Sequence, residues 1–385
     1  MKVEFKYFKT LGVFFSTDYD TALTKSWDEI TKNVKTSLGI ITGRNANIYQ
    51  RAILVNSLIA SKIWYTSHVY PLPFEHEKDI NLHIFRYIWN SFGRKPLERV
   101  ERNVLYKRKD EGGIGLLNIH IKAKSILAST TIKMFLNSDE TSIIKYYLAL
   151  RVNNIFGLNV LPTNVSYITT TYYEYAIDVI KLCIQNKDFP NINSKKIYMM
   201  LMPEIKPKVE NDYPLYDWNN IWKNVNFRHI NVNDRPIVFK YVHEILPNNK
   251  MLYQWRIRNN PQCEFCDVED SNIHRFYYCC KVQECLNWMR KLISYLCSMN
   301  VDSLMKILSF DLPKVNINIK NTLCIILSNY IGCIWFNRDN LENIIHVFRA
   351  RIIKDQKLNM KILGEKADKV FSSNYCKNIE FIYNI

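Results

Sequence analysis

Four residues of metal-ligating type, Cys263, Cys266, His274 and Cys279, fall within seventeen positions of the chain. A Cys-x2-Cys pair suits a tight knuckle that directs two thiolates at one point. His274 and Cys279 lie about one helical turn apart, so a short helix could present both. Zn²⁺ is commonly held by a tetrahedral Cys3His set, and four protein ligands leave no open position for a catalytic water. We therefore predict a structural zinc site.

Two alternatives to this ligand set stay open in the sequence. Free Cys is among the most buried residue types, so these positions could instead be unlinked small core residues. Cys280 or Cys285 could also replace Cys279 as the fourth ligand. The complete four-ligand spacing favours a metal site over unlinked core residues.

The remainder of the chain is predicted to be mainly helical. Only 10 Gly occur in 385 residues, and long Leu/Ile stripes run through a chain that is 48% hydrophobic. That length allows two or three domains with packed cores. Residues 1–15 are the exception, because Val3, Phe5 and Tyr7 alternate with charged residues before an apolar stretch, which predicts a small pair of strands.

The composition also indicates a compartment. No apolar segment follows Met1, and ten Cys without a signal peptide favour a reducing environment, so we expect an intracellular protein, in nucleus or cytoplasm, that is not secreted. The apolar stretch Leu323 to Phe336 is shorter than a membrane span requires and predicts a buried helix. We therefore expect no membrane partner.

Three amphipathic stripes follow the strand pair, at 27–41, 48–63 and 80–89, and predict a small helical bundle with Gly43 ending the first helix. The net charge of +16 favours a polyanionic partner, although a solvated face is an equally good explanation of the bundle's basic residues. The candidates there for contact with RNA or DNA are Arg44, Arg51 and Lys62.

A strongly basic stretch comes next, with seven positive charges in sixteen residues. Residues 104–106 within it are predicted to be extended, and 112–116 to form a structural turn that begins a helix through Phe135. Such a density of charge is well suited to contact a phosphate backbone. The candidate residues are Arg94, Lys95, Arg99, Arg102, Lys107, Arg108 and Lys109.

Further helices are predicted along the rest of the chain. A linker is expected at 203–214, and a helix capped by Asp270 or Ser271 should carry His274 and continue through Leu296. The basic residues of the tail, such as Lys354, Lys357 and Lys361, are interpreted as a solvated face. The other expected helices lie at 139–155, at 172–184, after Ser194, around 218–225, before Pro247, and in two or three segments of 301–385.

No complete catalytic motif is present in the sequence. Two-metal nucleotidyl transfer needs clustered carboxylates, and no Asp-Asp pair occurs. His243-Glu244 begins a metalloprotease motif, but Pro247 stands where the second His is required, so His243 is interpreted as a packed or capping residue. No catalytic residue is predicted.

The chain resembles the C-terminal part of LINE-type (non-LTR) retrotransposon reverse transcriptases. Phe8-Lys9-Thr10-Leu11-Gly12-Val13 looks like the segment that closes the palm domain in that family. Gly43-Arg44, Ile53 to Asn56 and Ser61 to Tyr65 look like the two helices of the family's thumb. Pro71-Leu72-Pro73 and Phe85 to Trp89 follow, as in that thumb, and Gly112 to Leu116 is similar to the family's Gly-Gly-Leu-Gly segment. Trp218 and Trp222 precede the Cys3His cluster, as in the family's zinc-binding domain.

The resemblance implies five segments: a palm remnant at 1–15, a thumb-like helical domain at 16–136, a helical connector at 137–212, a reverse-transcriptase zinc-binding domain at 213–290, and a helical region at 291–385. It implies a truncated fragment that binds RNA or DNA without its own polymerase centre. Mg²⁺ would be needed only by the full-length parent RNA-directed DNA polymerase. The alternatives are an active polymerase whose palm is encoded upstream, and a domesticated or decayed protein-binding scaffold.

Overall fold

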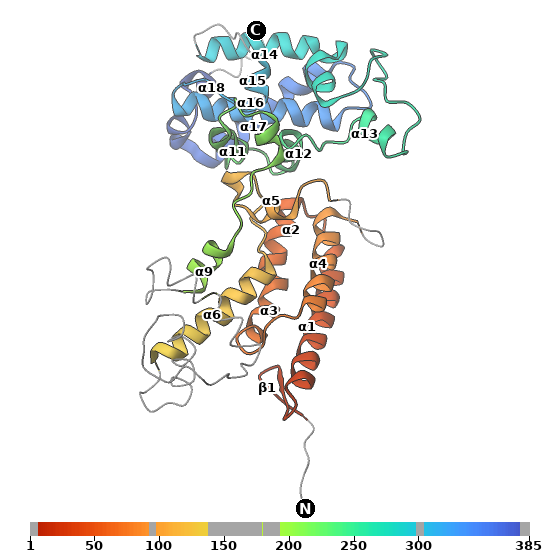
Figure 1. Cartoon of the computed structure of the whole chain (residues 1–385). Helices are drawn as coiled ribbons and strands as arrows, with labels where there is room; N and C mark the ends of the chain where they lie inside the picture. Colours follow the sequence, from red (N-terminus) through yellow and green to blue (C-terminus); the bar gives the residue numbers. More distant parts are fainter. Residues whose placement is uncertain (1–6, 92–97, 138–178, 180–192, 298–303, 378–385) are drawn as a thin grey trace, which may run out of the picture. The chain divides into compact units, whose positions relative to one another are not determined.

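The computed structural model describes residues 7–91, 98–137, 179, 193–297 and 304–377. These residues are mainly helical with a small two-stranded sheet near the N-terminus (Figure 1), which confirms the predicted fold class. Contacts group the chain into two compact units, 1–98 with 115–204 and 99–114 with 205–385. This grouping does not test the family boundaries, which stay predictions.

The sheet in the first unit is an antiparallel hairpin of β1 (Phe8–Thr10) and β2 (Val13–Phe15). Leu11 and Gly12 between them both have positive φ, as a tight hairpin turn requires. The hydroxyl of Tyr70 donates to the carbonyl oxygen of Phe14 at 2.9 Å. The predicted strand pair is therefore confirmed for these residues, whereas Val3 and Phe5 lie outside the described residues.

The three amphipathic stripes form helices as predicted. The second stripe is one continuous run whose middle is a π-helical segment, η1. Helix α1 packs against α3 and α4, and Gly43 ends α1 in a right-handed conformation. The bounds are α1 Tyr19–Thr42, α2 Ile48–Leu54, η1 Val55–Ile59, α3 Ala60–Thr66 and α4 Phe74–Trp89.

Two more helices complete the described part of this unit, α6 (Ile119–Asn137) and α9 (Ser194–Leu201), which pack against each other. The cap of α9 is Asn193, whose side chain accepts from two backbone N–H groups, so the expected cap at Ser194 is displaced by one residue. The helices predicted at 139–155 and 172–184 lie outside the described residues except for position 179.

The second unit begins with α5 (Arg102–Tyr106) and η2 (Lys109–Glu111). The prediction of an extended 104–106 is wrong, because Val104 and Leu105 are buried side by side on one helical turn. The glycine turn is confirmed as structural. Gly112 has φ +86, and a Cβ on Gly113 would lie 2.0 Å from the carbonyl oxygen of Lys107.

Helix α16 is the central element of the second unit, packed against α11, α12, α14 and α17. It is long and apolar enough to cross a membrane, but 72% of its most apolar window is buried inside the protein, as expected for a core helix. The other bounds are α10 Lys208–Asp212, α11 Trp218–Val225, α12 Arg235–Val242, α13 Asn249–Gln254, α14 Gln283–Cys297, α15 Leu304–Leu308, α16 Ile317–Phe336, α17 Ile344–Leu363, η5 Gly364–Lys369 and α18 Ser373–Lys377.

Two expectations for this unit need correction. The stretch 203–214 is partly helical, because α10 buries Val209 and Glu210 accepts a hydrogen bond from the Trp222 indole at 2.7 Å. The single helix expected from His274 to Leu296 is three segments: η3 (His274–Tyr278), η4 (Cys280–Val282) and α14. The chain breaks at Cys279, whose backbone is not helical.

Candidate metal centre

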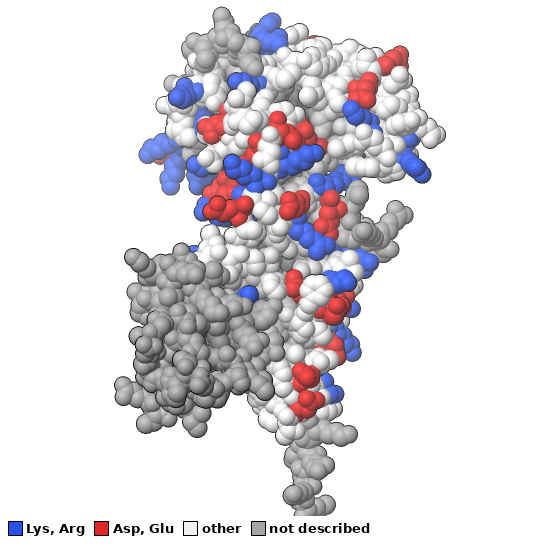
Figure 2. Space-filling view, viewed as in Figure 1, with Lys and Arg blue, Asp and Glu red and all other residues white. Residues whose placement is uncertain are grey.

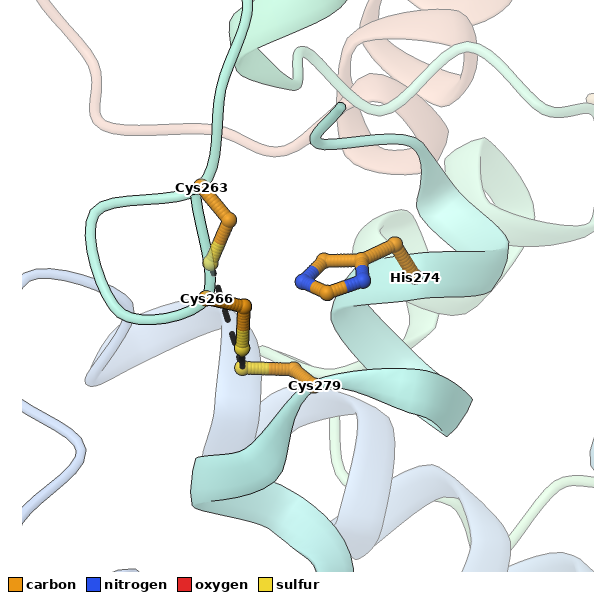
Figure 3. A group of neighbouring side chains, drawn as sticks. All are labelled: Cys263, Cys266, His274 and Cys279. Atoms are coloured by element: carbon orange, nitrogen blue, oxygen red, sulfur yellow. Dashed lines mark hydrogen bonds between the residues drawn. The ribbon is translucent and has the colours of Figure 1, made fainter. Parts of the chain in front are cut away.

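The four predicted ligands converge on one point. One donor atom from each of Cys263, Cys266, His274 and Cys279 lies within 4.8 Å of every other. The Sγ of Cys279 is 3.9 Å from that of Cys263 and 3.7 Å from that of Cys266. Sulfurs about 2.3 Å from a tetrahedral Zn²⁺ are spaced by about 3.8 Å. In Figure 3 the His274 ring points toward the three sulfurs. This cluster could hold a metal ion, and its donor set is compatible with zinc.

The first two cysteines lie on a short hairpin-like loop. A β-bridge joins Gln262 to Glu269, and the N–H of Cys263 donates to the carbonyl oxygen of Val268 at 2.7 Å. Asp267 adopts positive φ, which turns the chain back after Cys266. The loop is the knuckle that the Cys-x2-Cys spacing predicts.

The other two ligands come from one π-helical turn. The N–H of Cys279 donates to the carbonyl oxygen of His274 at 2.7 Å, and this turn brings the two side chains together. Isolated π turns are frequent at functional sites. Ser271 caps the turn, since its Oγ accepts from the N–H of His274, so Ser271 and not Asp270 is the cap.

Asp270 connects the knuckle to its surroundings. It is almost fully buried and forms an ion pair with Arg275 inside η3. Its other contacts include the N–H of Asn249 at 2.8 Å. Arg275 also donates to the carbonyl oxygen of Pro247 at 3.0 Å. These bonds hold the two ligand-bearing segments against the loop before α13.

The imidazole of His274 has an orphaned donor atom. Its Nε2 is buried and has no hydrogen-bond partner among the residues that the structure describes. Burying a polar nitrogen without a partner is costly, and a metal ion would satisfy it. Burial also lowers the pKa of His274, which favours the neutral imidazole that binds metals.

The three thiols lie where a nearby cation would favour their ionised form. Burial raises the pKa of Cys263 and of Cys279, because a buried thiolate lacks solvation. Burial alone would also raise the pKa of Cys266, but hydrogen bonds, led by that from the N–H of Cys280, lower it. A bound divalent cation would favour the thiolate form of all three.

The two alternative cysteines occupy different places. The Sγ of Cys280 is exposed and lies 3.3 Å from that of Cys266, but Cys280 is outside the group of mutually close donors. Cys285 is buried on α14 and is not in that group either. The geometry therefore favours Cys279 as the fourth ligand.

His243 is a packed residue, as predicted. Its ring lies 4.9 Å from that of Trp222 and 4.4 Å from that of Phe239, and its Nε2 is 2.8 Å from the carbonyl oxygen of Gly112. A carbonyl only accepts, so Nε2 carries the proton and donates. Burial lowers the pKa of His243 to about 4, so the ring is neutral at physiological pH.

Three of the side chains predicted to contact nucleic acid instead donate hydrogen bonds to backbone carbonyl oxygens of their own unit. Arg51 donates to the carbonyl oxygens of Tyr87 and Ile88, at the end of α4. Arg99 donates to the carbonyl oxygen of Ile245 and lies 4.7 Å from the ring centre of Trp255. Lys107 donates to the carbonyl oxygen of Ile205 at 2.8 Å.

The remaining candidates differ in exposure. Arg44 and Lys62 are exposed, and Arg108 is exposed but forms an ion pair with Asp110. Arg102 and Lys109 are half-buried, while Arg94 and Lys95 lie outside the described residues. In Figure 2, Lys and Arg are interspersed with Asp and Glu along the first unit, so the face in view is not uniformly basic.

Helix α17 carries basic residues that we interpreted from the sequence as a solvated face and did not count among the nucleic-acid contacts. Lys354, Lys357 and Lys361 are spaced at i, i+3 and i+7, so they share one helix face. All three are exposed, and within the described part of the chain none has an ion-pair or hydrogen-bond partner. The i, i+3, i+7 spacing of these lysines in the sequence already indicates that they share one face of a helix.

No family model matches the chain, and no curated protein matches it.

Proposed function

We propose that this chain is the thumb and zinc-binding part of a LINE-type reverse transcriptase, and that it binds RNA or DNA while a Cys3His-bound Zn²⁺ stabilises its second unit. The observation that carries the proposal is the convergence of Cys263, Cys266, His274 and Cys279. The cluster follows Trp218 and Trp222 in the motif order of that family. The zinc supplies folding energy and does no chemistry, because four protein ligands fill its coordination.

The net charge of +16 supports a polyanionic partner. The unpaired lysine stripe of α17 offers three ammonium groups to phosphates on one face, and Arg44 and Lys62 are exposed on the first unit. Such contacts read charge and not base sequence. The sequence contains no Asp-Asp pair of the polymerase type, so we propose binding and no catalysis by this chain alone.

Salt dependence of binding tests the nucleic-acid partner. Each neutralised phosphate lowers the slope of log affinity against log salt by about 0.9 on duplex DNA. We expect the Lys354→Glu/Lys357→Glu/Lys361→Glu variant to weaken binding and to make this slope shallower by up to about 2.7. Fluorescence anisotropy with labelled duplex DNA and single-stranded RNA, titrated from about 50 to about 200 mM salt, measures both.

A matched variant controls for total charge. Lys223, Arg290 and Lys291 are exposed on α11 and α14 of the same unit, and changing all three to Glu also lowers the net charge by six. The slope of log affinity against log salt should stay closer to the wild-type value in this control than in the α17 variant. Absence of salt-dependent binding by the wild-type protein would overturn the nucleic-acid proposal and favour a protein-binding scaffold.

Substitution of the ligands tests the zinc. Cys263→Ser or His274→Ala should abolish bound zinc and unfold residues near 250–290, because zinc binding supplies on the order of 10–16 kcal/mol in finger peptides. Cys280→Ser is the control, since it removes a neighbouring thiol outside the donor group. Mass-spectrometric metal analysis of the purified proteins would contradict the assignment if Cys263→Ser kept a full equivalent of zinc.

A further inference from the structure

A small aromatic pocket of about 100 Å³ lies in the second unit, apart from the α17 lysines. Its lining includes Tyr213, Tyr216, Trp218, Tyr241 and Glu244, and among the described residues no Lys or Arg lines it. Pockets for drug-sized ligands measure about 300–1,000 Å³, so this one suits a single compact group.

The ring of Tyr216 stands at a steep angle to each of two neighbouring rings. The planes of Tyr213 and Tyr216 meet at 77° with ring centres 5.8 Å apart, and those of Tyr216 and Trp218 meet at 62° with centres 6.1 Å apart. The indole N–H of Trp218 donates to the carbonyl oxygen of Tyr213 at 2.8 Å, which holds this segment in a closed turn. The ring of Tyr216 is therefore not stacked on that of Tyr213 or of Trp218, and all three residues line the pocket.

Glu244 brings a carboxylate to these walls. It follows α12 with φ 57, and its N–H donates to the carbonyl oxygen of Tyr241 while that of Ile245 donates to the carbonyl oxygen of Lys240. This is the helix-ending position where glycine is the usual residue. The Oε1 of Glu244 accepts from the hydroxyl of Tyr213 at 2.8 Å, so the carboxylate is held at the aromatic wall while the side chain stays exposed.

We propose that this pocket binds a trimethylammonium head group, the class carried by trimethyllysine side chains and by choline. Aromatic faces attract such cations, and sets of aromatic rings are the usual recognition site for quaternary ammonium groups. The carboxylate of Glu244 adds an opposite charge. The same carboxylate disfavours phosphates, and the pocket lining includes none of the lysines and arginines proposed to contact nucleic acid.

A charged ligand and its neutral isostere test the pocket directly. The 385-residue protein, purified in the presence of Zn²⁺, is titrated by calorimetry with choline and with 3,3-dimethylbutan-1-ol, in which carbon replaces the cationic nitrogen. We expect choline to bind about tenfold more tightly, because the two have the same shape and only choline is attracted by ring faces and carboxylate. Equal affinity, or no saturable binding of choline, would overturn the proposal.

Two peptides that differ only in a trimethylated or unmodified lysine distinguish the source of the head group. Preference for the trimethylated peptide over both the unmodified peptide and choline assigns the site to a protein tail, and equal affinity for that peptide and choline assigns it to the head group alone. Binding of both peptides with equal affinity would count against the proposal.

Variants locate the binding. Glu244→Gln keeps the size of the side chain and removes its charge, so it should lower choline affinity several-fold and leave that of the neutral isostere unchanged. Trp218→Leu should weaken both. Glu342→Gln is the matched control, an exposed glutamate of the same unit outside the pocket lining. If Glu244→Gln behaved like Glu342→Gln while helical content and zinc were retained, the pocket would not be the binding site.

Discussion

At the scale of single residues, the second unit depends on a few polar groups buried among apolar ones. Asp234 is fully buried; its Oδ1 lies 2.5 Å from Nη2 of Arg351, while its Oδ2 has no partner within the described chain. Burial raises the pKa of Asp234 to about 6, even though Arg351 acts in the opposite direction. In the folded protein, the ion pair with Arg351 therefore offsets only part of the cost of burying the ionised carboxylate.

The raised pKa of Asp234 predicts a pH dependence of stability. The pKa of an Asp side chain in the unfolded chain is about 3.9, so the folded state binds the proton of Asp234 more tightly. The stabilisation from this proton is complete below about pH 4 and is lost as the pH rises through about 6. Relative to Asp234→Asn, which does not titrate, the wild type should lose up to about 3 kcal/mol between these pH values.

Urea unfolding of both proteins at a series of pH values measures this difference, and the groups common to both cancel. A difference that stays constant with pH, or that grows in favour of the wild type as pH rises, would contradict the assignment.

At the scale of elements, helix α16 shows why a residue of low helix propensity can be required. Gly332 lies in the middle of this helix, where Gly costs about 1 kcal/mol relative to Ala. A Cβ there would lie 2.2 Å from Oδ1 of Asp234 and 2.9 Å from Nη2 of Arg351. The glycine makes room for the ion pair that joins α12 and α17 next to α16.

Gly332→Ala should therefore destabilise the second unit by about 1–3 kcal/mol, as overpacking of a well-packed site does, despite the better helix propensity of Ala. Gly39→Ala in α1 is the matched control, because nothing lies within 4 Å of its Cβ position, and it should stabilise its helix by about 0.5–1 kcal/mol. Thermal unfolding followed by circular dichroism measures both. An equal gain in the two variants would show that the ion pair does not occupy the space next to Gly332.

At the scale of the whole molecule, the proposed zinc belongs to only one of the two compact units. All four ligands lie in the unit formed by 99–114 and 205–385, and the apolar core of that unit includes Cys263 and Cys279. The helices α1 and α4 bury their own apolar stripe in the other unit. Loss of the metal should therefore act on one unit first.

Chelation of zinc should raise amide hydrogen exchange across 250–297 and leave the interior of α1 and α4 protected, because binding energy is supplied where the ligands are. Hydrogen exchange followed by mass spectrometry resolves the two regions. Re-addition of Zn²⁺, but not of Mg²⁺, should restore protection, since thiolates bind the softer ion. Uniform loss of protection in both regions would contradict this localised effect.

The sequence alone determined the features that depend on short spacing. Helical periodicity located α1 and α4, and the continuous apolar stretch Leu323 to Phe336 located most of α16. The spacing of Cys263, Cys266, His274 and Cys279 identified donors that the fold brings together. Local geometry limits what such patterns can form, so they are readable without the fold. The error at 104–106 arose where three residues are too few to distinguish a strand from one helical turn.

Only the tertiary structure decided which basic residues are free and where pockets form. Arg99 and Lys107 are bonded to carbonyl oxygens of Ile245 and Ile205, far along the chain, whereas the α17 lysines are left to solvent. The pocket beside Glu244 likewise combines residues from 213 to 309. The partner of a long charged side chain is set by whatever the fold packs beside it, and no spacing in the sequence encodes that neighbour.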